Sequence, residues 1–323
     1  MSPLLPAFSG KLLSSSLWLD GVLQLPKPLA DAHRDYLNDN GWLGKYDPGG
    51  SGGAIGGASE EDACDHVVNR FLNSAARMQY VCSDPKDDQA DVRDAVFDQL
   101  AEGRIHIIDL AAGNGAGTIS MLSLICELRR AGSIPQLPLN VSVSAVDFSP
   151  AALNHFAALL NKLSPWLAGA GINVELSLCH CDLTVLGDFC ETLDGFFADA
   201  RDRDVSRFLC VISAISGAKK EGVEPMIDSL KHAAAGLSHS KRNSSWLWVE
   251  PHIGKPWFTK LADAIQLTLK KIKHKFWTKG DSFSLTADVP MLKDPGTRSF
   301  HWRDPHNGKS AHSRVVVLAF RNR

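Results

Sequence analysis

The chain carries the stretch IIDLAAGNGAGT at residues 107–118, and this stretch decides the fold. Its apolar start is typical of a buried strand, Asp109 lies near the strand end, and glycines follow before a helical segment begins. Glycine adopts positive φ and lets a ligand approach the backbone, while the first turn of a helix offers unpaired N–H groups. Ligands of open parallel sheets bind at the carboxyl ends of strands. The stretch therefore predicts a ligand-binding turn between a strand and a helix.

Apolar strands and helical segments alternate on the carboxyl side of this turn. Strands are expected at 105–110, 141–146, 174–179, 208–212 and 246–249, and helices at 118–130, 150–163, 186–200 and 224–237. A long Lys-rich helix (257–275) and two late strands (283–287 and 314–320) should follow. Apolar strands separated by helices indicate a parallel sheet that is covered on both faces. The expected fold is doubly wound α/β, with a mostly parallel seven-stranded sheet.

Two further acids lie at the ends of the next two predicted strands. Asp147 ends the second strand about 30 residues beyond the glycines, where a carboxylate can accept both hydroxyls of a ribose. Asp182 follows the third strand, and a carboxylate there suits the donor amino group of an adenine. Three acids at three successive strand ends form the specific feature of this sequence.

This pattern resembles the class I S-adenosylmethionine-dependent methyltransferase superfamily over about residues 104–251 and the last strand. The family's first motif reads hydrophobic-hydrophobic-acid-x-Gly-x-Gly-x-Gly. Here Asp109 is the acid, Gly113 and Gly115 are the last two glycines, and Ala111 replaces the first glycine. The resemblance implies a Rossmann-like methyltransferase that uses S-adenosylmethionine and releases S-adenosylhomocysteine.

The resemblance also implies roles for individual residues. Asp109 would lie near the methionine end of the cofactor, Gly113 and Gly115 along its backbone, Asp147 at the ribose and Asp182 at the adenine. The full implied cofactor set is Asp109, Ala111, Gly113, Asn114, Gly115, Asp147, Phe148, Asp182, Leu183 and Ser213. The fifth strand ends in Glu250-Pro251, as it does in many members of the family.

A nicotinamide- or flavin-dependent oxidoreductase is the nearest alternative. Its glycine fingerprint normally has no acid at the position of Asp109, because a carboxylate there would repel the anionic pyrophosphate. A cofactor with a sulfonium and an amino group has the opposite preference. The sequence therefore favours the methyl donor over NAD(P).

The loop after the fourth strand bears on the acceptor. Residues 213–217 lack the acid or Asn followed by Pro-Pro and an aromatic that holds the amino groups of bases, and the chain contains no Pro-Cys for cytosine C5 transfer. An O or N acceptor is therefore predicted. Glu250 and His252 could form an acid/base pair, or Glu250 could cap a loop and His252 line the surface. Other candidate substrate contacts are Lys219, Lys220 and Trp257.

Three segments are expected along the chain. Residues 1–58 form an N-terminal arm with a Gly-rich linker, 59–103 a helical cap, and 104–323 the methyltransferase domain, whose 251–313 segment is a basic elaboration. Ser59, followed by acids, predicts a helix start. A helix over 59–78, with Asn69, Arg70 and Arg77, is expected either to cover the cofactor pocket or simply to support the sheet.

Charge is divided unevenly along the 323 residues. The 34 Lys+Arg nearly balance the 36 Asp+Glu, yet residues 1–250 carry a net −11 and residues 251–323 a net +9. The composition excludes disordered and fibrous classes. Because cationic and aromatic side chains alternate over 255–314, nucleic acid or another polyanion is a candidate partner, although an amphipathic helix with solvated lysines would show the same pattern. A small-molecule or protein O/N-methyltransferase and a non-catalytic cofactor-binding subunit also remain open.

The seven cysteines are scattered and odd in number, as in reduced cytosolic proteins. Cys179-His180-Cys181 with Cys190 falls short of the four ligands of a structural zinc, so no metal is predicted. No stretch approaches the ~18 apolar residues of a membrane span, and no signal peptide is evident. A cytoplasmic location is expected, and the sequence does not indicate an oligomeric state.

Overall fold

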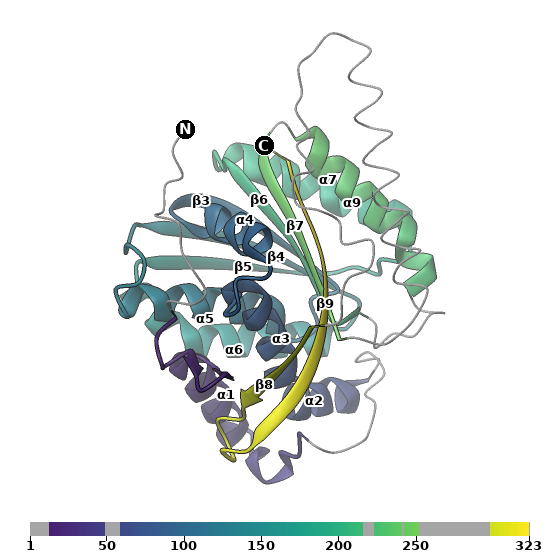
Figure 1. Ribbon diagram of the computed structural model, residues 1–323. Coiled ribbons are helices and arrows are strands. Elements are labelled where there is room, and N and C mark those ends of the chain that lie inside the picture. Colours follow the sequence, from purple (N-terminus) through teal and green to yellow (C-terminus); the bar gives the residue numbers. More distant parts are fainter. Residues whose placement is uncertain (1–12, 49–58, 216–222, 241, 252–297, 323) are drawn as a thin grey trace.

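A mixed β-sheet with helices on both faces organises the chain (Figure 1). The structure is a computed structural model that describes residues 13–48, 59–215, 223–240, 242–251 and 298–322. Within these residues, nine strands follow the order β1-β2-β8-β9-β7-β6-β3-β4-β5. The predicted α/β class is confirmed.

Five parallel strands form the centre of the sheet, and all five were predicted. They are β3 (Gly103–Leu110), β4 (Leu139–Asp147), β5 (Ile172–His180), β6 (Arg207–Ser213) and β7 (Asn243–Glu250). The chain runs outward from β3 through β4 to β5, and β6 then pairs with the opposite side of β3. The direction of winding thus reverses between β3 and β6, which is where open α/β sheets bind ligands.

The predicted count of seven strands is wrong, because nine are present in the described part of the chain and three of their pairings are antiparallel. Strand β9 (Ser310–Asn322) is longer than predicted, and β8 (Arg298–Arg303), β1 (Trp18–Leu19) and β2 (Val22–Gln24) were not predicted. Strands of two or three residues carry too little alternation to be recognised, and here β1 pairs with β2 and β2 with β8. The expected helix 257–275 and strand 283–287 lie outside the described residues.

The hairpin of β8 and β9 extends beyond the carboxyl end of β7. Residues 316–322 of β9 pair with β7, and Val316 lies opposite the last residue of that strand, Glu250. Residues 310–315 continue past this point and pair with β8. Figure 1 shows the long yellow strand running down past the end of β7.

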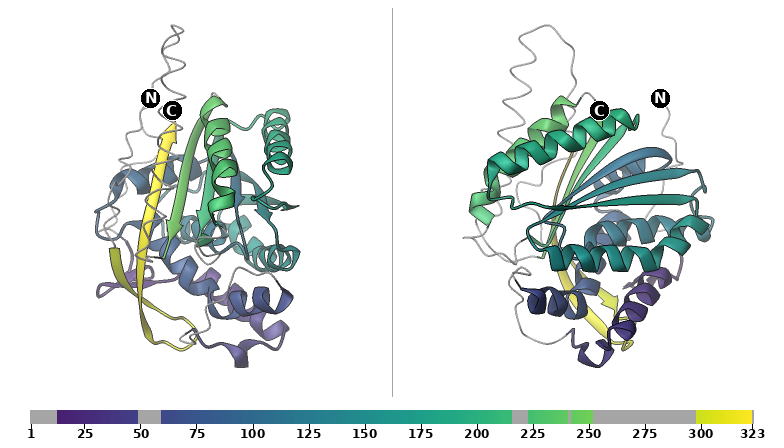
Figure 2. Two further views of the ribbon diagram at one scale, coloured as in Figure 1. Left: turned by 90° about the vertical axis from the view of Figure 1, so that its right-hand side faces the viewer. Right: turned by 180° about the vertical axis from the view of Figure 1, so that it is seen from behind.

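Helices lie on both faces of the sheet, as two further views show (Figure 2). One face is covered by α1 (Lys27–Asp39), α3 (Phe71–Ser83), α4 (Ala90–Leu100), α5 (Ala116–Arg130) and α6 (Pro150–Gly169). The other is covered by α7 (Leu186–Asp202) and α9 (Ile227–His239), which follows the 3-10 turn η4 (Glu224–Met226). A second 3-10 turn, η2 (Leu43–Lys45), follows α1. The four predicted helices between the parallel strands are confirmed.

The predicted helix over 59–78 is two helices. Helix α2 (Glu60–Asn69) begins with the predicted cap, since the Asp62 N–H donates to Ser59 Oγ at 3.1 Å and Asp62 accepts in return from the Ser59 N–H. The chain then bends at Arg70, whose φ of −117° ends α2 and starts α3. Helix α2 packs on α6 and α3, above the carboxyl ends of the strands.

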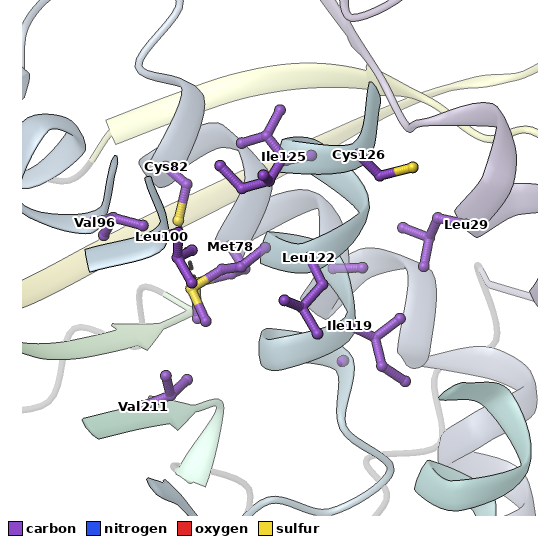
Figure 3. Packing of buried hydrophobic residues seen from close by; sticks show 14 of the residues in the cluster. Leu29, Met78, Cys82, Val96, Leu100, Ile119, Leu122, Ile125, Cys126 and Val211 are labelled. Atoms are coloured by element: carbon purple, nitrogen blue, oxygen red, sulfur yellow. Dashed lines mark hydrogen bonds between the residues drawn. The ribbon is translucent and has the colours of Figure 1, made fainter. Parts of the chain in front are cut away.

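Two apolar clusters hold the layers together, one on each face of the sheet. In the larger cluster, side chains of α3, α4 and α5 meet above β6 (Figure 3): Met78, Cys82, Val96, Leu100, Ile119, Leu122, Ile125 and Val211. The smaller cluster joins α7 and α9 to Trp246 and Trp248. Each such aliphatic side chain contributes about 2 kcal/mol when it is fully buried. Among the described residues, no helix has both the length and the apolar content to cross a membrane.

Candidate functional site

The loop between β3 and α5 is shaped by three residues with positive φ: Ala111 (51°), Gly113 (53°) and Gly115 (76°). The Ala112 N–H donates to Val146 O at 2.9 Å, which ties the loop to β4. Ala111, where the resemblance would place a first glycine, adopts the left-handed conformation. An alanine in this conformation costs about 1 kcal/mol in strain.

The two glycines serve different purposes. A Cβ on Gly115 would lie 2.3 Å from the ring of Phe156 in α6, so the helix packs directly on this glycine. A Cβ on Gly113 would have nothing within 4 Å. Gly115 is thus required by packing, whereas Gly113 borders open space at the sheet edge, where a ligand can reach the backbone.

Asp109 is fully buried at the end of β3. Thr118 Oγ1, in the first turn of α5, donates to Asp109 Oδ2 at 2.7 Å. Asp109 Oδ1 has no hydrogen-bond partner among the described residues. Burial raises the pKa of Asp109 to about 8, and the nearby Asp147 adds to the increase. A buried carboxyl group with a free oxygen is suited to a cationic or hydrogen-bond-donating ligand.

Asp147 joins the ends of β3 and β4. Its Oδ2 accepts the Gly113 N–H and its Oδ1 the Ser149 N–H, both at 2.8 Å. Burial raises the pKa of Asp147, and these hydrogen bonds partly offset the increase. Each carboxylate oxygen retains a second lone pair, so Asp147 can both hold the glycine loop in place and accept from a ligand hydroxyl.

The edge of the site at β5 combines an acid with an exposed aromatic ring. Asp182 is exposed, and its Oδ1 accepts the Thr184 N–H at 2.8 Å. Phe148, directly after Asp147, is 41% exposed, whereas Leu183 is buried. His180 Nε2 donates to Phe148 O at 2.9 Å and fixes the backbone there. An exposed ring beside a carboxylate is suited to a flat heterocycle that carries an amino group.

On the other side of β3, the ends of β6 and β7 are held by Glu250. Its Oε1 accepts the Ile215 N–H at 2.8 Å and Trp248 Nε1–H at 2.6 Å. Ser213 lies closer to the loop, because a Cβ on Gly117 would come within 3.0 Å of its Cβ. Glu250 therefore fixes the chain after β6, which is the capping role that the sequence left open beside catalysis.

Residues of α2 and α3 that were outside the predicted site also face it. Asn114 Nδ2 donates to His66 Nδ1 at 3.0 Å, so α2 contacts the glycine loop directly. Burial lowers the pKa of His66 to about 4, which keeps its ring neutral and able to accept. Burial lowers the pKa of Arg77 in α3 to about 10, and the negative charge of Glu250 partly offsets this decrease. Arg77 Nε has no hydrogen-bond partner among the described residues. Arg70 and Arg77 belong to the segment 59–78 that the sequence expects either to cover the pocket or to support the sheet, whereas His66 was not singled out.

The structure thus brings most of the predicted cofactor set to one edge of the sheet, at the ends of β3, β4, β5 and β6. The remaining candidates, His252, Lys219, Lys220 and Trp257, lie outside the described residues. Cys179, Cys181 and Cys190 are free thiols. Cys181 lies at the site edge itself, where its backbone N–H donates to Asp147 O at 3.1 Å.

Comparisons with known proteins find distant likenesses to solved structures. No protein-family model and no curated protein matches it. A candidate class I S-adenosylmethionine-dependent methyltransferase from Listeria monocytogenes is 11% identical, with a TM-score of 0.35 over 90% of this chain and 68% of that one. A structure that describes the conversion of a disulfide bond into a thioacetal group during echinomycin biosynthesis is 11% identical, with a TM-score of 0.31 over 67% of this chain and 76% of that one. A deacetylase triple mutant from teicoplanin biosynthesis is 13% identical, with a TM-score of 0.25 over 68% of this chain and 99% of that one. At such values the likenesses do not assign a family, and the site rests on its own geometry.

Proposed function

We propose that the chain binds S-adenosylmethionine along the carboxyl ends of β5, β4 and β3 and transfers its methyl group to an O or N acceptor on RNA or another polyanion. The observation that carries the proposal is the row of acids Asp182, Asp147 and Asp109 at the carboxyl ends of three adjacent strands. The buried Asp109 Oδ1, which has no partner among the described residues, marks the end of this row where a cationic group is most stabilising.

The residues of the edge fit this cofactor from end to end. Asp182 and the exposed Phe148 ring suit the adenine, and Asp147 suits the ribose hydroxyls. The open space at Gly113 admits the methionine part of the cofactor, which is joined to the ribose. When bound, the cofactor supplies a methyl group on a cationic sulfonium, and the protein's task is to position both reactants. The carboxyl group of Asp109 then faces the cationic end.

The acceptor belongs on the side of β6 and β7 in this arrangement. Neighbouring strands are about 4.8 Å apart, so the end of β7 lies about 10 Å from the end of β3. Ser213 and Arg77 face this region, and Glu250 positions the loop that borders it. Glu250 acts through the Ile215 N–H as a positioning residue, because its Oε1 already accepts two hydrogen bonds.

Calorimetric titration with S-adenosylhomocysteine tests the cofactor site. The wild-type chain should bind it, and Asp147→Asn and Asp182→Ala should each weaken binding about tenfold or more, because each removes one charge-assisted hydrogen bond. Asp228→Ala, which removes an exposed carboxylate of α9 on the far side of the sheet, is the matched control and should change nothing. Absence of binding by the wild-type chain would refute the proposal.

A second candidate function is a cofactor-binding subunit without transferase activity. The engagement of Glu250 Oε1 by two structural hydrogen bonds favours it, because a carboxylate held in this way is a poor general base. Incubation with methyl-labelled cofactor and fractionated cell extract separates the two. Label in an RNA, protein or small-molecule fraction supports transfer and identifies the acceptor, whereas tight binding without labelling supports the subunit.

A further inference from the structure

The solvent side of the β8–β9 hairpin carries a row of cationic and imidazole side chains. We call this the hairpin face, and it consists of Ser299, His301, Arg303, Ser310, His312 and Arg314. All six are exposed or nearly so. Cross-strand register places Ser299 opposite Arg314, His301 opposite His312 and Arg303 opposite Ser310. Three successive cross-strand pairs therefore present one continuous polar strip.

Residues that alternate with the hairpin face are buried on the opposite side of the strands. Phe300 stacks on Tyr80 of α3 with ring centroids 4.2 Å apart, and Trp302 is 1% exposed. Trp302 Nε1 donates to Ser313 Oγ at 3.2 Å. Because side chains alternate strictly along a strand, this packing fixes the direction in which Arg303, Arg314 and the two histidines point.

Among the described residues, the cations of this face have no carboxylate partner. Arg303 donates only a long hydrogen bond, 3.4 Å, to Gly308 O in the described part of the chain. No acid is found on the same face of β1, β2, β8 or β9, whose residues are all described. By contrast, Arg298 at the start of β8 is paired with Asp88 at 3.2 Å. With Lys309 exposed in the adjoining turn, the strip forms an uncompensated positive patch, and such a patch attracts anions.

Two exposed rings lie in the middle of this positive strip. The centroids of His301 and His312 are 5.2 Å apart, with their planes tilted by 56°. Unstacked bases bind on rings of this kind, and arginines on either side can pair with the adjoining phosphates. An anionic membrane would require apolar side chains among the cations. On β8 and β9 the middle positions carry His301 and His312 instead, and Leu19 and Val22 continue this cross-strand row only on the short strands β1 and β2.

The turn between β8 and β9 is anchored to the N-terminal arm. Asp304 accepts from Tyr46 Oη–H, the His306 N–H and Asn307 Nδ2–H, each at 2.8 Å. Arg34 of α1 donates to Pro305 O, also at 2.8 Å. The hairpin face is thus presented by a rigid element, and a preorganised surface loses little entropy when a ligand binds.

We propose that the hairpin face binds single-stranded nucleic acid, with Arg303, Arg314 and Lys309 on phosphates and bases stacked on His301 and His312. The face begins where β7 ends, and therefore adjoins the acceptor side of the sheet edge. That the hairpin face binds the methyl acceptor rests on the proposed function, whereas nucleic-acid binding by this face does not.

Fluorescence anisotropy with a labelled oligouridylate of about 20 nucleotides, titrated at several KCl concentrations, tests the proposal. The double variant Arg303→Glu/Arg314→Glu should bind at least tenfold more weakly, and the slope of log affinity against log salt should fall by about 1.4, or about 0.7 for each lost phosphate contact. His301→Ala/His312→Ala should weaken binding several-fold and leave the slope unchanged, because stacking releases no counterions. Arg201→Glu, an exposed arginine of α7 on the far side of α9, is the control and should change neither quantity.

Unchanged affinity and slope in the arginine variant would overturn the proposal. So would binding of wild-type chain to phosphatidylserine vesicles but not to oligouridylate. Because the substituted side chains are exposed, circular dichroism melting should be unaltered in all variants. Titration of each with S-adenosylhomocysteine separates the two proposals: oligonucleotide binding without cofactor binding leaves this inference standing and refutes the proposed function, and the reverse result refutes only this inference.

Discussion

At the scale of single residues, the protonation state of Asp109 distinguishes the candidate site from an ordinary buried carboxylate. Burial raises its pKa to about 8, so most molecules hold a proton there at pH 7. A cationic ligand favours the ionised form. If the cofactor's cationic end lies at Asp109, as proposed, binding at pH 7 must release a proton.

Calorimetric titration with S-adenosylmethionine at pH 7, in phosphate and in Tris, measures this proton. These buffers differ in ionisation enthalpy, so the observed heats should differ by an amount equal to nearly one proton released. Asp109→Asn should abolish the buffer dependence. Equal heats in both buffers at pH 7 for the wild-type chain would contradict the assignment of Asp109 to the cationic end.

Substitution of the two loop glycines by alanine separates packing from ligand access. Gly113→Ala should cost about 1–2 kcal/mol in unfolding free energy, because its φ is positive, and should weaken S-adenosylhomocysteine binding tenfold or more, because the new methyl group enters open space at the edge. Gly115→Ala adds an overlap with the Phe156 ring, so we expect a loss of about 3 kcal/mol or more. Urea unfolding and calorimetry measure both effects.

Gly132→Ala provides the control for backbone strain alone. Gly132 follows the carboxyl end of α5, has a φ of 70° and has nothing within 4 Å of its Cβ position. It should lose about as much stability as Gly113→Ala and retain full ligand affinity. Equal ligand affinity in Gly113→Ala and Gly132→Ala would show that the space at Gly113 is not used.

At the scale of elements, a pair of histidines joins α1 to the turn of the β8–β9 hairpin. His33 Nε2–H donates to Val67 O at 2.8 Å, so His33 Nδ1 must accept from His306 Nε2–H, also at 2.8 Å. Burial lowers the pKa of His33 to about 3 and that of His306 to about 4, and Arg34 contributes to the latter shift while Asp304 and Asp31 oppose it. Both rings are therefore neutral in the folded chain above pH 5.

Acid should weaken this connection. In the unfolded chain both histidines take up protons near pH 6.5, whereas in the folded chain they do so only near pH 3 to 4. Their contribution to stability is complete above pH 6.5 and is lost as the pH falls from 6.5 toward 4. His306→Gln keeps an N–H for His33 and does not titrate, so its loss of unfolding free energy between pH 7 and pH 5 should be smaller than that of wild type by about 1 kcal/mol.

Urea unfolding at pH 7, 6 and 5 measures this difference. His232→Gln, which replaces an exposed histidine of α9, should follow the wild-type pH dependence. If the unfolding free energies of His306→Gln and wild type fall in parallel with pH, His306 does not stay neutral in the folded chain.

The sequence predicts the elements of the parallel sheet well because each of them carries its own signal. Strands β3 to β7 are rich in apolar residues, which alternate with polar ones in β4 and β5. Ser59 with the acids after it indicates the start of α2. Strand β8 lacks such a signal, since its alternation of arginine, histidine and aromatic residues is equally typical of a basic loop. Its partners are β9 and the three-residue β2, which lies more than 270 positions away, and pairing over that distance cannot be read from a local pattern.

At the scale of the whole molecule, the N-terminal arm belongs to the same core as the sheet. Leu23 of β2 is fully buried and pairs with Trp302, within the apolar cluster that also contains Ile105 and Val143. Leu23→Ala should therefore lower the unfolding free energy by about 2–4 kcal/mol. Circular dichroism and tryptophan fluorescence should report one coincident transition, with an unchanged dependence on urea.

Leu19→Ala in β1 is the matched control. Leu19 is 43% exposed, so its loss should change the unfolding free energy by less than about 0.5 kcal/mol. Two separate transitions in Leu23→Ala would mean instead that the arm and hairpin unfold independently of the parallel sheet.

The candidate site could be predicted only where its residues lie on strand ends. Asp109, Asp147 and Asp182 were found because carboxyl ends of parallel strands share one edge, a rule that needs no contacts. His66 was not assigned to the site, and Arg77 was placed only on a helix expected either to cover the pocket or to support the sheet. Helices can pack on a sheet in many ways, and only the observed contact of His66 with Asn114 selects one of them. The unequal division of charge could be read from the sequence. That the described basic residues near the carboxyl end lie on one face of a hairpin could not.

Strand β9 fixes the distance between the carboxyl end of β7 and the tip of the β8–β9 hairpin. From Val316, opposite the end of β7, to Ser310 at the tip of the hairpin, the strand rises about 20 Å. No flexible linker lies between these points, since β9 is continuous from Ser310 to Asn322. A chain of nucleotides bound to the hairpin would therefore reach the sheet edge at a constant distance from its binding site. The strand would select the modified nucleotide by its position along the chain and not by the identity of its base.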